Sequence, residues 1–194
     1  MNEILSVWGD KRQWRIILLT ALAYAVLLVP LKPFAIVPGY TELRLASFVP
    51  VLFGVLFGPA AAWGAAFGNL GADFFGTLGP GSLFGFIANF LFAYVPYKVW
   101  ELLREPGKER INARQVGHFV LAALAGSAVC GLVIGAGLFM LGLQDFQNAM
   151  FMVMIITLNN AVVSVLLGSA GLLLLREPAR RAGLLYDEKA GVAE

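Results

Sequence analysis

The 194-residue chain is 59% hydrophobic and only 13% charged, with a formal net charge of +2 and a single histidine. A soluble domain carries about 25% charged residues, so this composition excludes an ordinary water-soluble protein. The charged residues are also clustered, and the uncharged runs between them are long enough for a bilayer core of about 30 Å. The sequence therefore predicts an integral membrane protein.

Long hydrophobic segments predict six transmembrane helices in one all-α bundle. They cover residues 14–31, 44–57, 60–78, 82–103, 114–141 and 148–175. The second helix is short and is joined to the third by a tight turn at "FGP", residues 57–59. The last two are longer than a simple span requires, so they are expected to tilt or to project beyond the bilayer. No soluble domain is attached, and residues 1–194 are expected to form a single transmembrane domain.

The lysines and arginines orient this bundle. Of the 14 basic residues, only Lys32 and Arg44 fall on one side, and all the others flank the opposite ends of the helices. The positive-inside rule then places both termini in the cytoplasm, in the cell (inner) membrane of a prokaryote. The connections at 32–43, 77–82 and 142–147 are expected to face outward.

The predicted third helix carries two distinct stripes. Every fourth residue from Ala60 to Gly76 is small, and a neighbouring stripe becomes polar with Asn69, Asp73 and Thr77. Small residues allow another helix to approach closely, so this side is expected to be buried. A carboxylate at membrane depth is costly, and it therefore marks a functional-site hypothesis by default.

Polar residues from several predicted helices converge on the outer half of the membrane, where they predict a pocket reached from outside. The candidate substrate-binding residues are Glu42, Arg44, Asn69, Asp73, Asn89, Asn159 and Asn160. Each has a simpler interpretation as well. A transmembrane asparagine often only hydrogen-bonds a neighbouring helix, and Asp73 could form a structural ion pair with Arg44. A largely uncharged pocket lined by amides and aromatic rings would suit a heterocycle, such as a deazapurine, a nucleobase or a vitamin.

The sequence contains none of the common motifs for catalysis, metal binding or nucleotide binding. There is no G-x-S-x-G or H-E-x-x-H motif and no P-loop, so the chain is not expected to be an enzyme or to hydrolyse ATP by itself. His118 and Cys130 stand alone, which predicts no metal site and no cofactor. The basic residues form three short clusters, and no nucleic-acid partner is expected.

Six helices, cytoplasmic termini, a short second helix and a pocket under the outer loops together resemble the S components of energy-coupling factor (ECF) transporters. The stretch "YTELRLASFVPVLFGVLFGPAAAWGAAFGNLGADFFG" carries most of the resemblance and looks nearest to the queuosine-precursor-type members. The resemblance implies a membrane-embedded subunit that binds a vitamin or related micronutrient. It also implies an alanine face on the first helix, here Ala21 and Ala25, that docks on a transmembrane coupling subunit. Two cytosolic ATPases would then supply the hydrolysis.

Two other functions remain open at this point. Asp73 could couple protons or cations in a small secondary transporter, although no internal repeat is visible in the sequence. Alternatively, the polar residues could serve only helix packing in a membrane assembly protein that transports nothing.

Overall fold

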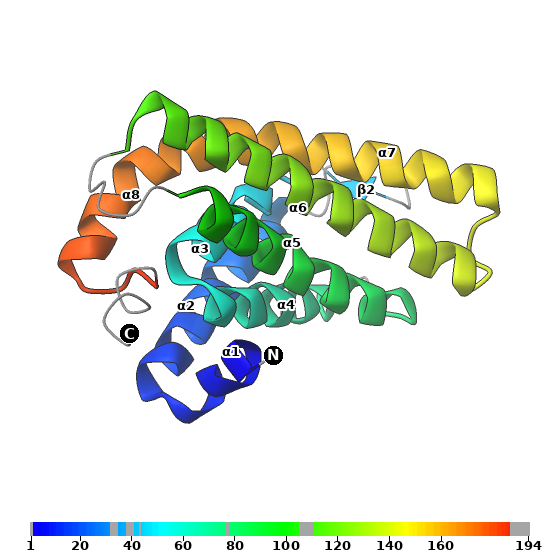
Figure 1. Cartoon of the computed structure of the whole chain (residues 1–194). Helices are drawn as coiled ribbons and strands as arrows, with labels where there is room; N and C mark the ends of the chain where they lie inside the picture. Colours follow the sequence, from blue (N-terminus) through cyan, green and yellow to red (C-terminus); the bar gives the residue numbers. More distant parts are fainter. Residues whose placement is uncertain are drawn as a thin grey trace.

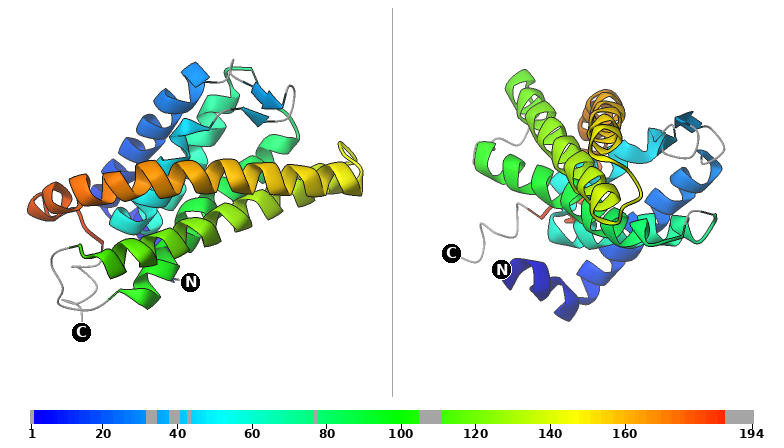
Figure 2. Two further views of the ribbon diagram at one scale, coloured as in Figure 1. Left: turned by 90° about the horizontal axis from the view of Figure 1, so that it is seen from above. Right: turned by 90° about the vertical axis from the view of Figure 1, so that its right-hand side faces the viewer.

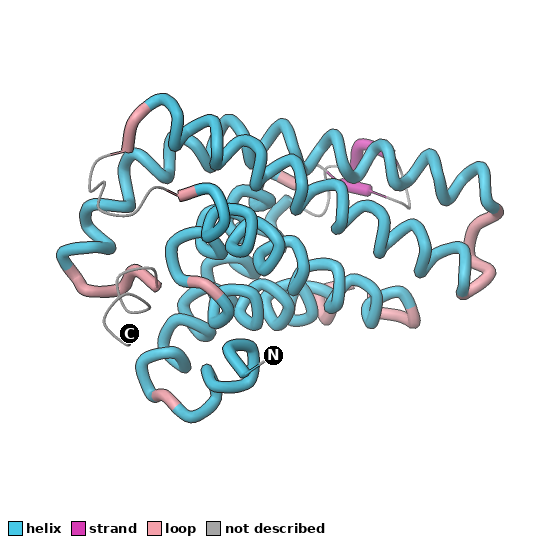
Figure 3. Tube along the Cα trace, in the orientation of Figure 1, coloured by secondary structure: helices cyan, strands magenta, loops and turns pink. Residues whose placement is uncertain are grey.

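The computed structural model describes residues 2–31, 35–37, 41–42, 44–76, 78–104 and 111–186. This part of the chain is helical almost throughout (Figure 3). Its first half contains α1 Asn2–Ser6, η1 Val7–Gly9, α2 Lys11–Leu28, η2 Val29–Leu31, η3 Leu45–Ser47, α3 Phe48–Phe57 and α4 Pro59–Asp73. The second half contains α5 Gly81–Leu103, α6 Ala113–Met140, α7 Phe146–Val163, the π-helix η4 Ser164–Gly168 and α8 Ser169–Arg181.

Each of the six predicted ranges contains a helix, and the helical fold class is confirmed. Two details differ from the expectation. A small antiparallel hairpin, β1 Ala35–Val37 with β2 Thr41–Glu42, lies in the connection between α2 and α3. In addition, α4 ends at Asp73, because the following residues 74–76 form a turn with Gly76 at a φ of 124°.

The turn between α3 and α4 is as tight as the sequence predicts. Gly58 has a φ of 66°, a left-handed conformation that glycine adopts without strain. Pro59 then opens α4, at a position where its missing N–H costs nothing and its fixed φ suits the helix.

Small residues bring α4 against α2, as expected from the stripe of small residues. A Cβ added at Gly64 would lie 2.6 Å from the carbonyl oxygen of Ile17, and one at Gly68 would lie 2.8 Å from that of Ala21. The two backbones are therefore in direct contact, and a larger side chain at either glycine would force the helices apart.

Two of the three connections predicted to face outward, those after α4 and after α6, lie at one end of the bundle. Figure 1 shows the end of α4, the start of α5 and the α6–α7 connection at the same end, with α8 at the other. The paired helices α6 and α7 extend furthest toward that end (Figures 1 and 2). The C-terminal end of α4, where the candidate site residue Asp73 lies, is therefore at this end of the bundle.

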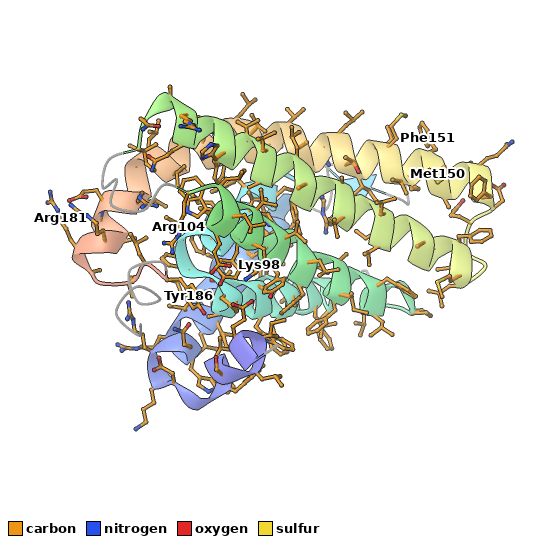
Figure 4. The ribbon with its side chains drawn as sticks, viewed as in Figure 1. Lys98, Arg104, Met150, Phe151, Arg181 and Tyr186 are labelled. Atoms are coloured by element: carbon orange, nitrogen blue, oxygen red, sulfur yellow. The ribbon has the colours of Figure 1, made fainter. Side chains whose placement is uncertain are left out.

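Three described helical segments are long and apolar enough to cross a membrane: Gly81–Leu103, Ala113–Met140 and the continuous Phe146–Arg181. The last two have 28 and 36 residues, which confirms that they are longer than a simple span requires. Met150 and Phe151 on α7 are 47% and 45% exposed and point outward, as lipid-facing side chains would (Figure 4). The chain is thus a membrane protein with several apolar helices, while the count of six spans and the cytoplasmic termini stay predictions.

Candidate functional site

Arg44, Asn69 and Asp73 form one hydrogen-bonded chain. Arg44 immediately precedes η3, and Asp73 is the last residue of α4. Nη2 of Arg44 donates to Oδ1 of Asn69 at 2.9 Å, and Nδ2 of Asn69 donates to Oδ2 of Asp73 at 3.4 Å. Asn69 is only 3% exposed, and the two charged residues beside it are half-buried. The buried amide therefore links a cation that precedes η3 with an anion that ends α4.

Neither charge is placed to stabilise its own helix. The N-terminal end of a helix carries a partial positive charge, yet the cation Arg44 stands at the N-terminal end of the η3–α3 segment. The C-terminal end carries a partial negative charge, yet the anion Asp73 stands at the C-terminal end of α4. Helix stability therefore does not explain the position of either charge.

Asn89 lies beside this chain on α5 and is fully buried. Its Oδ1 accepts a hydrogen bond from the Tyr24 hydroxyl of α2 at 2.8 Å, and its Nδ2 donates to the carbonyl oxygen of Gly85 at 2.8 Å. Gly85 faces α4, since a Cβ added there would lie 3.1 Å from Nδ2 of Asn69 and 3.9 Å from Oδ2 of Asp73. Asn89 thus connects α2 and α5 one turn from the Arg44–Asn69–Asp73 chain.

Asn160 takes part in a second network, which joins α7, η3 and α6. Its Oδ1 accepts from the Ser47 hydroxyl at 2.7 Å, and its Nδ2 donates to Sγ of Cys130 at 3.5 Å. The Ser164 hydroxyl donates to the carbonyl oxygen of Ser47 at 3.0 Å. All four residues are 0% exposed. In this state both functional groups of Asn160 bond to other helices, which is the helix-packing role that the sequence left open.

The remaining predicted site residues are less fully described. Asn159 is half-buried on α7, next to Asn160. Glu42 ends β2, and its side chain lies outside the described residues. Most of the connection at 32–43, which the sequence predicts to face outward, also lies outside them, as does Thr77. Within the described residues, no three His, Cys, Asp or Glu side chains are grouped as metal ligands would be.

A family model described as QueT transporter matches residues 15–177, which span most of the chain and every site residue discussed above. The chain belongs to the QueT transporter family. This is the family of queuosine-precursor-type ECF S components, so the resemblance seen in the sequence is confirmed. No curated protein and no solved structure matches the chain.

The predicted docking residues Ala21 and Ala25 lie at the edge of the packed face of α2. Both are half-buried, and the backbone of Ala21 contacts α4 at Gly68. The neighbouring Leu22 is 65% exposed and faces outward. Ala25 therefore borders the exposed surface of α2, whereas Ala21 is partly engaged within the chain.

Sequence patterns do not identify three further polar residues that join the helices: Tyr24, Ser47 and Ser164. Each is 0% exposed and hydrogen-bonded to another helix or to η3. An isolated hydroxyl residue within an apolar segment forms no recognisable sequence pattern. Their importance arises from partners that are distant in the sequence, such as the 113 positions that separate Ser47 from Asn160.

Proposed function

We propose that the chain is the substrate-binding subunit of an ECF-type ABC importer, and that it captures a small micronutrient from outside a prokaryotic cell. Membership of the QueT transporter family supports this function. The single structural observation that carries it is the Arg44–Asn69–Asp73 chain, in which two charges share one buried amide. Charges held at unfavourable helix ends are a cost to the fold that a bound substrate would justify.

The substrate class follows from the hydrogen-bond donors and acceptors that the site residues present. Arg44 presents a planar donor group, and the half-buried Asp73 presents an acceptor. A fused heterocycle of the deazapurine type carries acceptors and N–H donors along its edges, so it could satisfy both side chains at once. Asn69 would orient the two, and Glu42 and Asn159 would complete the walls of the site. The fully buried Asn89 and Asn160 would hold the surrounding helices in place.

The importer would require partners, because the chain has no P-loop of its own. We propose one transmembrane coupling subunit that docks on α2 near Ala25, together with two cytosolic ATPases. Co-expression of the chain with such a module, followed by affinity purification in mild detergent, tests this assembly. A stable complex that lacks any ATPase would contradict the ECF mechanism.

A binding measurement tests the substrate class. We expect calorimetry on the purified protein to detect 7-deazaguanine, and we expect Arg44→Gln to weaken that binding at least tenfold, since a charge-assisted hydrogen bond contributes about 1.5–3 kcal/mol. Leu22→Ala on the exposed face of α2 serves as the control and should bind normally. Equal binding by wild type and Arg44→Gln, or no binding of 7-deazaguanine, guanine or adenine, would refute the proposed site or substrate class.

A further inference from the structure

Ser47 attaches η3 to α7 and η4 through hydrogen bonds. Its backbone N–H donates to the carbonyl oxygen of Arg44 at 2.9 Å, which closes the turn that Arg44 begins. Its hydroxyl donates to Asn160 on α7 at 2.7 Å, and its carbonyl oxygen accepts from the Ser164 hydroxyl on η4 at 3.0 Å. One fully buried serine therefore ties the backbone of Arg44 to two successive turns of another helix.

Ser164 begins the π-helix η4, a wider turn that is rare inside helices and is often found at functional sites. The end of the same turn is also confined. A Cβ added at Gly168 would lie 2.8 Å from Cζ of Phe119 and 3.8 Å from Cβ of Phe48, the first residue of α3. The π-helix thus packs against the start of α3 and presents the Ser164 hydroxyl to η3.

We propose that Ser164 and Asn160 are positioning residues for the substrate site, which hold Arg44 in place through Ser47. This inference rests on the proposed role of Arg44 in binding. The Arg44 side chain spans from η3 to Asn69 on α4, so a small shift of η3 would move its guanidinium away from the Asn69–Asp73 pair. The hydrogen bonds of Ser47 prevent that shift, and a site held ready in this way binds without first having to become ordered.

The chain offers a matched control for the loss of a buried hydroxyl. Ser127 on α6 is 0% exposed, as Ser164 is, but its hydroxyl has no hydrogen-bond partner among the described residues. Ser164→Ala and Ser127→Ala remove the same atom from equally buried positions. Only the first removes a bond to η3.

The first experiment needs no substrate. Hydrogen exchange of the purified, substrate-free protein should show faster exchange across residues 44–48 in Ser164→Ala, with α5 and α6 unchanged. Ser127→Ala should leave residues 44–48 as protected as in wild type. Unchanged protection of that segment in Ser164→Ala overturns the inference, whatever the protein binds.

The second experiment uses 7-deazaguanine in a double-mutant cycle. We expect Ser164→Ala to raise the Kd roughly fivefold in wild type, the loss that corresponds to one hydrogen bond. We expect it to have little further effect in the Arg44→Gln background, because its influence passes through Arg44. A fivefold loss that persists in Arg44→Gln would overturn the positioning role. If hydrogen exchange of residues 44–48 becomes faster in Ser164→Ala but wild type binds no 7-deazaguanine, the substrate class is wrong. The conclusion that Ser164 holds η3 in place then remains.

Discussion

Asp73 illustrates how the choice between a structural and a functional role turns on a single residue. Asn69 already gives the guanidinium of Arg44 a buried acceptor. The carboxylate of Asp73 is half-buried and stands at a helix end where the dipole disfavours it. Helix stability does not explain this position, so we propose that Asp73 contacts the substrate.

This interpretation makes a prediction for Asp73→Asn. We expect binding of 7-deazaguanine to weaken about tenfold, because a charged acceptor is replaced by a neutral one. The melting temperature of the substrate-free protein should change by less than about 3 °C, which corresponds to about 1 kcal/mol in a chain of this size. Calorimetry and a thermal shift assay provide the two measurements.

The structural alternative for Asp73 predicts the opposite pattern. If Asp73 serves only to neutralise Arg44, Asp73→Asn would lower the melting temperature by leaving a partly buried charge without its partner. Adding Arg44→Gln would then restore it. That result would assign the pair to the fold and not to the substrate.

Gly85 provides a second prediction at the scale of single residues. An alanine there places a Cβ 3.1 Å from Nδ2 of Asn69, which is closer than ordinary van der Waals contact, so Asn69 must move. We expect Gly85→Ala to raise the Kd for 7-deazaguanine roughly fivefold, the effect of displacing one hydrogen-bonding amide. Gly81→Ala on the same helix has no atom within 4 Å of the added Cβ and should bind normally. Equal binding by both variants would place Asn69 outside the site.

Among the helices, α2 has a packed face and an exposed face. Its packed face contacts α4 so closely that Gly64 and Gly68 cannot carry side chains without a shift. Its outer face exposes Leu22 and Val26, each 65% accessible. Ala25 lies between these faces, which makes it the better probe of docking than Ala21.

We expect Ala25→Trp to block close approach of the coupling subunit while leaving the substrate site intact. Copurification with the ECF module and uptake in cells should both fall, whereas binding of 7-deazaguanine by the isolated chain should persist. Leu132→Trp, at an exposed position of α6 away from α2, controls for the added bulk. Normal uptake by a variant with tryptophan at both Ala21 and Ala25 would show that the docking face lies elsewhere.

For the molecule as a whole, the carboxylate of Glu3 connects the N-terminal helix α1 to α5. Oε1 of Glu3 accepts from the Tyr94 hydroxyl at 2.6 Å and pairs with Nζ of Lys98 at 3.1 Å. Its Oε2 accepts from the Tyr97 hydroxyl at 3.1 Å. The ring of Tyr186 packs edge-on against that of Tyr97 at 5.3 Å, on the same side of the bundle as Lys98 (Figure 4). Segments near both ends of the chain therefore meet on α5.

The Glu3 cluster predicts a pH dependence of stability. Burial raises the pKa of Glu3, but hydrogen bonds from Tyr94, Lys98 and Tyr97 outweigh it, and the net pKa lies below its ordinary value of 4.5. A carboxylate with a lowered pKa stabilises the fold fully above the unfolded-state pKa, and this contribution is lost as the pH falls through the folded-state pKa.

We therefore expect Glu3→Gln to melt at a lower temperature than wild type at pH 7. The difference should shrink as the pH falls below about 4.5, where the wild-type carboxylate becomes protonated. Other titrating groups are common to both proteins and cancel in the difference. A difference that stays constant down to pH 3 would show that the charge of Glu3 contributes nothing to stability.

The membrane class, the positions of the helices and the family could be predicted from the sequence, because they depend on local properties. Hydrophobic length marks the helices, Pro59 after Gly58 marks the α3–α4 turn, and the small residues of α4 mark its packed side. The polar residues of the candidate site could be picked out for the same reason, since Asn69 and Asp73 are conspicuous in an apolar helix.

Only the tertiary structure decided which of those residues lie together. The contact of Asn69 with Asp73 follows from their four-residue spacing, but the local sequence does not mark Arg44 as the other partner of Asn69. Nor does it mark Ser47 and Cys130 as the partners of Asn160. The difference between the two asparagines depends on partners far apart in the chain, which the packing of the helices brings together. Packing of this kind is a property of pairs of helices, and a pattern read along one helix cannot contain it.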